Sequence, residues 1–184
     1  MRAVILKGVN DLELVDDLPV PECGPDDVVV RIRAVGVCGT DLSAIAGHAA
    51  PSQLPWVMGH EGGGEIVEVG ANVTDRRVGQ RVVIEPNFPC MTCEWCRSGA
   101  TSVCADMVSP GWTWQGVLAE YYVGPARHTW VVPDSVPDAA LGCIEPLAVG
   151  VTAVKRSGIG PGEEALIVGS GSVGQFVTQA LRAV

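Results

Sequence analysis

Four cysteines between residues 90 and 104 constrain this chain more than any other feature of its sequence. Thiolates at this spacing are typical of a tetrahedral structural zinc site, in which all four ligands are sulfur. Such a site has no open coordination position, so we expect the zinc to hold together a lobe at residues 86–105 and to take no part in catalysis. The predicted ligands are Cys90, Cys93, Cys96 and Cys104.

Two other uses of clustered cysteines fit the sequence less well. Disulfides require an oxidising compartment, and the segment that begins at Met1 lacks a secretion signal. Ordinary core thiols would require a regular apolar pattern, which Pro86, Pro89 and Glu94 interrupt. Metal binding is therefore the preferred interpretation of the cluster.

The composition predicts a folded protein rich in turns. The 184 residues include 23 glycines and 13 prolines, hydrophobic residues make up 47%, and the formal net charge is -9. This acidic balance would repel nucleic acid and anionic lipid, so neither is an expected partner. No apolar run approaches the ~20 residues that a membrane-spanning helix needs. We therefore expect a cytoplasmic protein with no membrane contact.

Short apolar runs predict a mainly β domain over residues 1–153, whose strands form a barrel. Turn residues such as Gly8 and Asn10 separate the runs. From Asp138 to Gly158 the apolar positions follow helical spacing instead. The expected strands cover residues 2–6, 12–15, 28–35, 65–69, 79–84, 116–123 and 128–132.

His60 and Glu61 form the centre of a second group of candidate metal ligands. A histidine beside a glutamate is by itself more typical of a structural hydrogen-bonded pair. Cys38 changes that balance, because it precedes an expected helix capped by Thr40 or Asp41, and a helix N-terminus favours the thiolate that zinc binds. We expect the nearby glycines to leave room for a cofactor or substrate; they are Gly59, Gly62, Gly63 and Gly64.

Residues 169–174 have the G-x-G-x-x-G pattern of dinucleotide-binding turns. An apolar run at residues 164–168 predicts a buried strand before the turn, and a helix follows it. This order predicts the start of a Rossmann domain at residues 154–184, with a pyrophosphate on the helix N-terminus. The expected cofactor-binding residues are Gly169, Gly171, Ser172, Val173 and Gly174. The apolar face of the helix comprises Val173, Phe176, Val177, Ala180, Leu181 and Val184.

Together the motifs resemble the zinc-dependent medium-chain alcohol and polyol dehydrogenases, in order and spacing, over the whole chain. They are residues 38–41, 59–61, the four-cysteine lobe, 119–121, 145–147 and 169–174. The resemblance implies a GroES-like β barrel with a catalytic zinc, followed by a Rossmann domain that binds NAD or NADP. It also implies hydride transfer between this cofactor and a small secondary alcohol, polyol or sugar. The individual substrate stays open.

The resemblance also implies roles for single residues. Cys38 and His60 would bind the catalytic zinc, and either Glu61 or Glu145 would complete the protein ligands. A zinc site with an acidic third ligand resembles that of the sorbitol-dehydrogenase branch of the family. Thr40 corresponds to the hydroxyl that passes on the substrate proton. With the four-cysteine lobe, the expectation is two zinc ions per chain, one catalytic and one structural.

The chain ends before the residue that would distinguish NAD from NADP, so we expect it to be part of a longer enzyme. We expect the complete enzyme to be a homo-oligomer. This chain alone should be inactive and should self-associate, because its Rossmann strand would have no neighbour. One alternative is a non-catalytic, zinc-bound GroES-like module for binding or oligomerisation. Another is a zinc-free quinone reductase, which would need neither the lobe nor Cys38 and His60.

We expect Cys143 to be a buried thiol and His48 a surface residue. Four aromatic residues are expected in the core or an interface rather than in a pocket: Trp56, Phe88, Trp112 and Trp114.

Overall fold

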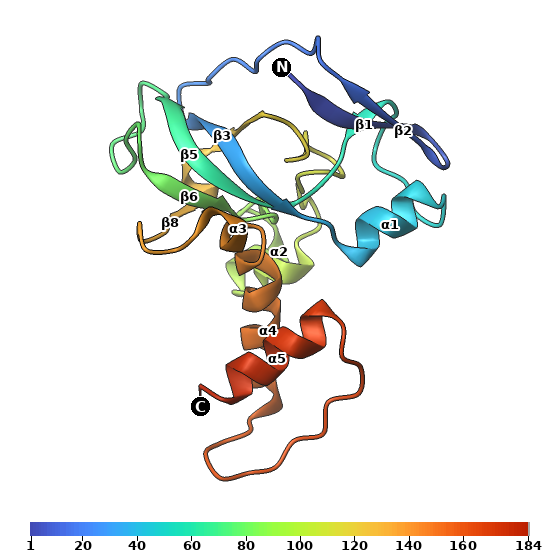
Figure 1. The fold of residues 1–184 in the computed structure, drawn as a ribbon. Helices are drawn as coiled ribbons and strands as arrows, with labels where there is room; N and C mark the ends of the chain where they lie inside the picture. The colour runs from blue at the N-terminus through green and yellow to red at the C-terminus, as the bar shows by residue number, and fades with distance from the viewer. Residues whose placement is uncertain (184) are drawn as a thin grey trace.

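Two antiparallel sheets lie at one end of the molecule, and a helical extension leads away from them (Figure 1). The structure is a computed structural model that describes residues 1–183. One sheet has three strands in the order β2-β1-β4, and the other has five in the order β7-β3-β5-β6-β8. The strands are β1 (Ala3–Gly8), β2 (Asp11–Val15), β3 (Asp27–Gly36), β4 (Trp56–Val57), β5 (Glu61–Val69), β6 (Arg81–Ile84), β7 (Tyr121–Pro125) and β8 (Thr129–Val131).

The centre of the five-stranded sheet carries the main core. Val28 and Val30 of β3 and Ile66 of β5 are fully buried and pack in one cluster. Burial of each such side chain is worth roughly 1.5–3 kcal/mol. A slip of one residue in register would turn these side chains to the other face of the sheet, and much of this stabilisation would be lost. The strands predicted at residues 28–35 and 65–69 are confirmed, and β5 begins earlier than predicted, at Glu61.

The predicted mainly β domain is confirmed, but within residues 1–183 its strands do not close into a barrel, because β7 and β8 are the two free edges of one open sheet. The sheets meet through the segment before β7, where the Val4 N–H donates to the Leu118 carbonyl at 2.8 Å. The strand expected at residues 116–123 is therefore divided. Its first part hydrogen-bonds to the Met58 and Gly59 carbonyls, and only its end continues into β7.

Glycines in β5 allow the chain to pack closely on itself. A Cβ on Gly64 would lie 2.0 Å from the Arg31 carbonyl oxygen, and one on Gly62 would lie 2.8 Å from a methyl of Val117. The glycine between them meets the β6 backbone in the same way. The prediction that these three glycines leave room for a cofactor or substrate is therefore wrong, since neighbouring strands occupy the space.

The helices after the sheets form the extension seen in Figure 1. Helix α4 ends at Gly158, whose positive φ of 72° is the left-handed conformation that glycine adopts easily. Within α4, a Cβ on Gly150 would lie 2.9 Å from the backbone of α5, so glycine permits this close crossing. The helices are α1 (Gly39–Ile45), α2 (Glu94–Arg97), η1 (Thr101–Val103), η2 (Ala126–His128), α3 (Asp138–Leu141), α4 (Ile144–Ser157) and α5 (Ser172–Leu181). Over residues 1–183, none of them has the length and apolar character needed to span a bilayer.

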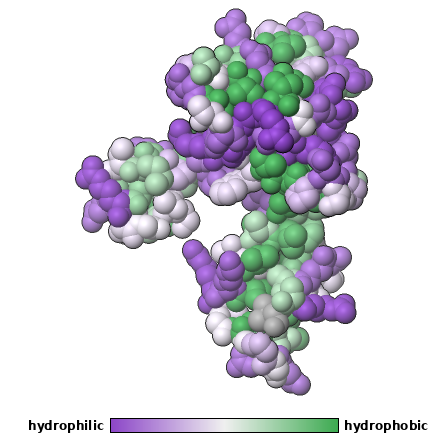
Figure 2. All heavy atoms as spheres, turned by 90° about the vertical axis from the view of Figure 1, so that its left-hand side faces the viewer, coloured by the Kyte–Doolittle hydropathy of each residue, from purple (hydrophilic) through white to green (hydrophobic). Residues whose placement is uncertain are grey.

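Residues 164–168, predicted to be a buried strand, form no strand in this structure. Leu166 and Val168 are 91% and 93% exposed. A strand needs a hydrogen-bonded neighbour, and no strand within residues 1–183 lies beside this segment. Figure 2 shows apolar residues along the lower part of the molecule, which is the helical extension. Helix α5 follows as predicted, while Val184 lies outside the described residues.

Candidate metal centres

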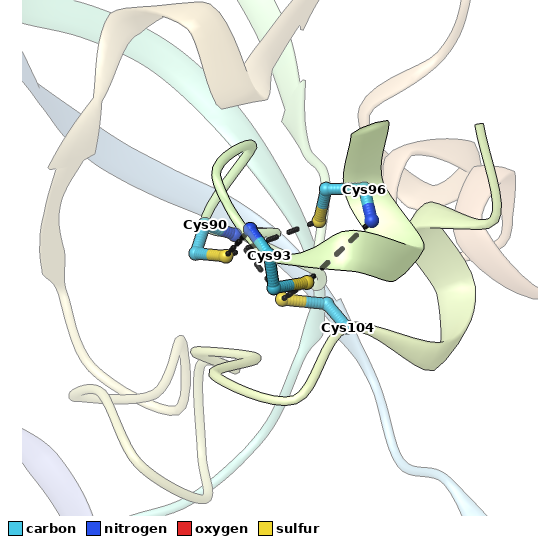
Figure 3. A group of neighbouring side chains, drawn as sticks. All are labelled: Cys90, Cys93, Cys96 and Cys104. Atoms are coloured by element: carbon cyan, nitrogen blue, oxygen red, sulfur yellow. Dashed lines mark hydrogen bonds between the residues drawn. The ribbon is translucent and has the colours of Figure 1, made fainter. Parts of the chain in front are cut away.

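The four cysteines of the lobe converge on one point (Figure 3). All four sulfur atoms lie within 4.8 Å of one another, and the Cys90–Cys96 and Cys93–Cys104 sulfur pairs are each 4.0 Å apart. A tetrahedron with Zn–S bonds of about 2.3 Å has sulfur atoms about 3.8 Å apart. The observed cluster is therefore close to the size that a zinc ion requires.

Hydrogen bonds to sulfur prepare this cluster for a cation. The Thr92 hydroxyl, followed by the N–H groups of Thr92 and Cys93, lowers the pKa of Cys90 to about 6. Burial and neighbouring sulfurs instead raise the pKa of Cys96 to about 12. Burial and nearby sulfurs therefore oppose ionisation of Cys96, and a zinc ion would supply the positive charge that favours its thiolate.

A second candidate centre combines Cys38, His60 and Glu61, whose ligand atoms also lie within 4.8 Å of one another. The register of the five-stranded sheet explains this meeting. Gly36 at the end of β3 pairs with Glu61 at the start of β5, so the residues just beyond each strand end emerge side by side. One sulfur, one imidazole and one carboxylate form a donor set that suits a catalytic zinc with a position left open.

Asp41 is a buried partner of this centre that sequence reasoning placed only in a helix cap. Its carboxylate is 1% exposed, accepts a hydrogen bond from the Cys38 N–H at 3.0 Å and lies 3.5 Å from Nδ1 of His60. Burial by itself would lower the pKa of His60, but the Asp41 carboxylate and the Cys38 sulfur outweigh it and raise this pKa to about 9. The surroundings of His60 therefore stabilise positive charge.

We expect Asp41→Asn to weaken zinc binding at the Cys38–His60–Glu61 centre by about 10–100-fold, the usual effect of losing a carboxylate behind a ligating histidine. The amide keeps the shape of the side chain but removes the charge facing Nδ1 of His60. Competition with a chromogenic chelator measures the change. Asp75→Asn is the matched control, because Asp75 is an exposed partner of Arg76. Equal zinc retention in both variants would remove Asp41 from the metal centre.

The remaining predicted residues lie around this centre in different ways. Glu145, in the first turn of α4, has a pKa raised by burial and by the charge of Glu61, although nearby His60 acts in the opposite direction. It therefore faces the same region but lies outside the compact ligand group. Thr40 is exposed. Cys143, predicted to be buried, is exposed, because the preceding residues take the inward positions before α4 begins.

The glycine-rich turn leads directly into the first turn of α5. Gly169 has a φ of 107°, and a Cβ on Gly174 would lie 2.1 Å from its carbonyl oxygen. Gly171 caps α5, so Ser172 and Val173 occupy the first turn of this helix. The five predicted cofactor residues are thus gathered at one helix N-terminus, beside a pocket of about 290 Å³.

Three of the four aromatic residues support the prediction of core roles, because Phe88 is buried and Trp56 and Trp112 are partly buried, whereas Trp114 is 36% exposed and does not. Trp56 and Trp112 pack against the buried cluster around Met58. Phe88 stacks on His128 at a centroid distance of 4.4 Å, and Trp114 contacts the edge of Phe88. These contacts fix the base of the lobe to the sheet. His48 is exposed, as predicted.

Comparison with known proteins agrees with this geometry. The family model of the alcohol dehydrogenase GroES-like domain matches residues 24–134. D-xylulose reductase A of Aspergillus niger is 36% identical over 176 residues, a match that covers 92% of this chain and 49% of the relative. Sorbitol dehydrogenase of Bombyx mori is 34% identical over 191 residues, covering 99% and 53%. The chain thus spans about half the length of the curated relatives it matches.

Solved structures give the same result. A Sinorhizobium meliloti protein assigned as a zinc-binding dehydrogenase and crystallised with NADP superposes with a TM-score of 0.94 at 34% identity. The match covers 99% of this chain and 53% of that one. Galactitol-1-phosphate dehydrogenase from Escherichia coli also has a TM-score of 0.94, at 30% identity, with 100% and 53% covered.

Proposed function

Because the chain belongs to the alcohol dehydrogenase GroES-like domain family, we propose that it supplies the zinc-binding part of a hydride-transferring enzyme. The substrate class is a secondary alcohol, polyol or sugar, and the cofactor is NAD or NADP. The observation that carries the proposal is the meeting of Cys38, His60 and Glu61 as a three-ligand set beside an orienting carboxylate. The names of the relatives support the choice of polyol and sugar substrates.

Each residue has a part in the proposed reaction. When bound, zinc supplies a charge that lowers the pKa of an alcohol, and the nicotinamide supplies the hydride acceptor. Cys38, His60 and Glu61 hold the metal, while Asp41 fixes the His60 ring. The exposed hydroxyl of Thr40 passes the substrate proton towards solvent.

The proposal divides the chain into a zinc-binding catalytic domain at residues 1–153 and the start of a Rossmann domain at residues 154–184. The tight turn at Gly169 and the capped start of α5 support the second assignment. In the cofactor-bound enzyme, the N–H groups at the start of α5 bind the pyrophosphate. Homo-oligomerisation stays a prediction.

Glu61 is the carboxylate ligand in this proposal, and Glu145 acts from just outside the ligand set. We therefore expect Glu145→Ala to keep the metal while lowering turnover of the full-length protein by about 10–100-fold. Zinc analysis and steady-state kinetics measure both properties. Glu164→Ala is the control, because Glu164 is exposed on the helical extension. Loss of one zinc would instead make Glu145 a direct ligand, and unchanged turnover would remove it from the site.

The direct test of function uses the full-length protein that contains this chain. Reduction of NAD or NADP is followed with a panel of polyols, sugars and simple diols. We expect reduction with at least one of these alcohols, together with its loss after chelation of the less tightly held zinc. A zinc-loaded protein that reduces neither cofactor with any of them would favour the non-catalytic binding module.

A further inference from the structure

Two glycine backbones approach each other closely beside Glu61, one of the three candidate ligands. Gly36 ends β3, and Gly142 lies between α3 and α4. A Cβ on Gly36 would lie 2.6 Å from the Gly142 carbonyl oxygen, and a Cβ on Gly142 would lie 2.7 Å from the Gly36 nitrogen. Neither glycine has a positive φ, so close approach, rather than backbone conformation, excludes a side chain at both positions.

The space above Gly36 is occupied by a carboxylate of the metal centre. A Cβ on Gly36 would lie 2.3 Å from Oε2 of Glu61, which is well inside van der Waals contact. Glu61 is 7% exposed and pairs with Gly36 across the sheet, so few other directions are open to its side chain. The absence of a side chain at Gly36 therefore leaves free the space that this carboxylate occupies.

The same contact governs the second carboxylate. Helix α3 packs on β3 and β5, and Gly142 connects it to the first turn of α4, which carries Glu145. If the two glycine backbones moved apart, the start of α4 would move away from β3 and take Glu145 with it. One backbone contact thus connects the strand end that pairs with Glu61 to the segment that leads to Glu145.

We propose that Gly36 and Gly142 are positioning residues that place the Glu61 carboxylate as the metal ligand and hold Glu145 behind it. The inference rests on the proposed zinc centre. Zinc ligands stay within about 0.2 Å of their preferred distances, so displacement of the Glu61 carboxylate by an added methyl group is enough to weaken the site. The nearest atom is the end of the flexible Glu61 side chain, and the next is the Gly142 carbonyl oxygen at 2.6 Å, which belongs to the connection between α3 and α4 and not to the sheet. An added methyl group therefore moves this carboxylate and this connection, and the pairing of β3 with β5 can remain intact.

The test measures zinc retention in Gly36→Ala. We expect the Cys38–His60–Glu61 zinc to be lost to a chelator at least ~10-fold faster than in wild type, by analogy with other losses of ligand support. The lobe zinc should stay bound and serves as an internal measure of folding. Replacement of the more labile zinc by Co²⁺ gives a second readout, because its visible absorption reports the ligand geometry. Gly39→Ala is the matched control, since Gly39 adjoins Cys38 but a Cβ there would meet nothing within 4 Å.

A second substitution separates positioning from general damage. Glu61→Asp shortens the side chain. In the Gly36→Ala background this shortening makes room for the added methyl group, so Glu61→Asp should slow zinc loss. In the wild-type background Glu61→Asp moves the carboxylate away from the metal, so zinc loss should become faster. Failure of this rescue, or retention in Gly36→Ala equal to that in Gly39→Ala, would overturn the role of Gly36. A wild-type protein that binds only the lobe zinc would overturn the proposed centre itself, which is a distinguishable result.

Discussion

Cys96→Ser is expected to release the lobe zinc and unfold residues 86–105. Cys96, in α2, is one of two buried ligands of the cluster, together with Cys104, and the residues around Cys96 in the lobe are largely exposed. Structural zinc in small domains contributes roughly 10–16 kcal/mol of apparent binding free energy. That is as large as the whole stability of an ordinary domain, about 5–15 kcal/mol, so contacts within the lobe cannot replace it. Zinc analysis and limited proteolysis of the lobe measure the outcome.

The matched control for this prediction is Cys143→Ser. Cys143 is an exposed thiol at the start of α4, outside both candidate metal centres. The Cys143→Ser protein should keep both zinc ions and the protease resistance of wild type. If Cys96→Ser also kept its full zinc content and an uncut lobe, the four sulfurs would not form a structural metal site.

Cys38→Ser is expected to remove only the other zinc. Cys38 supplies the single sulfur of that centre, and a neutral serine hydroxyl is a much poorer zinc ligand than a thiolate. In the full-length protein we expect kcat/KM to fall by more than the ~100-fold that marks the upper range for residues behind a ligand. The lobe zinc should be unaffected, because it is held by separate sulfurs.

Cys23→Ser is the control for the second prediction. The Cys23 sulfur faces the Asp27 carbonyl at 3.5 Å and belongs to neither cluster. Its replacement should leave metal content and turnover unchanged. Turnover in Cys38→Ser comparable to that in Cys23→Ser would exclude a catalytic metal at Cys38.

Features that depend on neighbours in sequence were the ones that could be predicted. The spacing of Cys90, Cys93 and Cys96 brings their sulfurs together within a short segment, and the apolar runs of β3 and β5 determine strands locally. The candidate centre at Cys38 and His60 is predicted from the residue types and the expected helix after Cys38, and the resemblance supports it. Sheet register explains it afterwards, because β3 and β5 pair at the ends from which these residues emerge.

Features that depend on distant contacts could not be predicted in this way. Asp41 turns towards His60 only because the strand ends meet, although its place three residues after Cys38 was an available signal. The function of Gly62 to Gly64 depends on which strands approach them. Residues 164–168 have the composition of a strand, but hydrogen bonding in a sheet requires a neighbour that residues 1–183 do not provide.

The zinc-to-protein ratio of the purified chain, measured alongside Cys38→Ser, tests the central claim most directly. We expect two zinc ions per wild-type chain and one in Cys38→Ser, with the remaining ion resistant to chelation because four thiolates hold it. A single zinc per wild-type chain, unchanged by Cys38→Ser, would contradict the claim that Cys38, His60 and Glu61 form a metal centre.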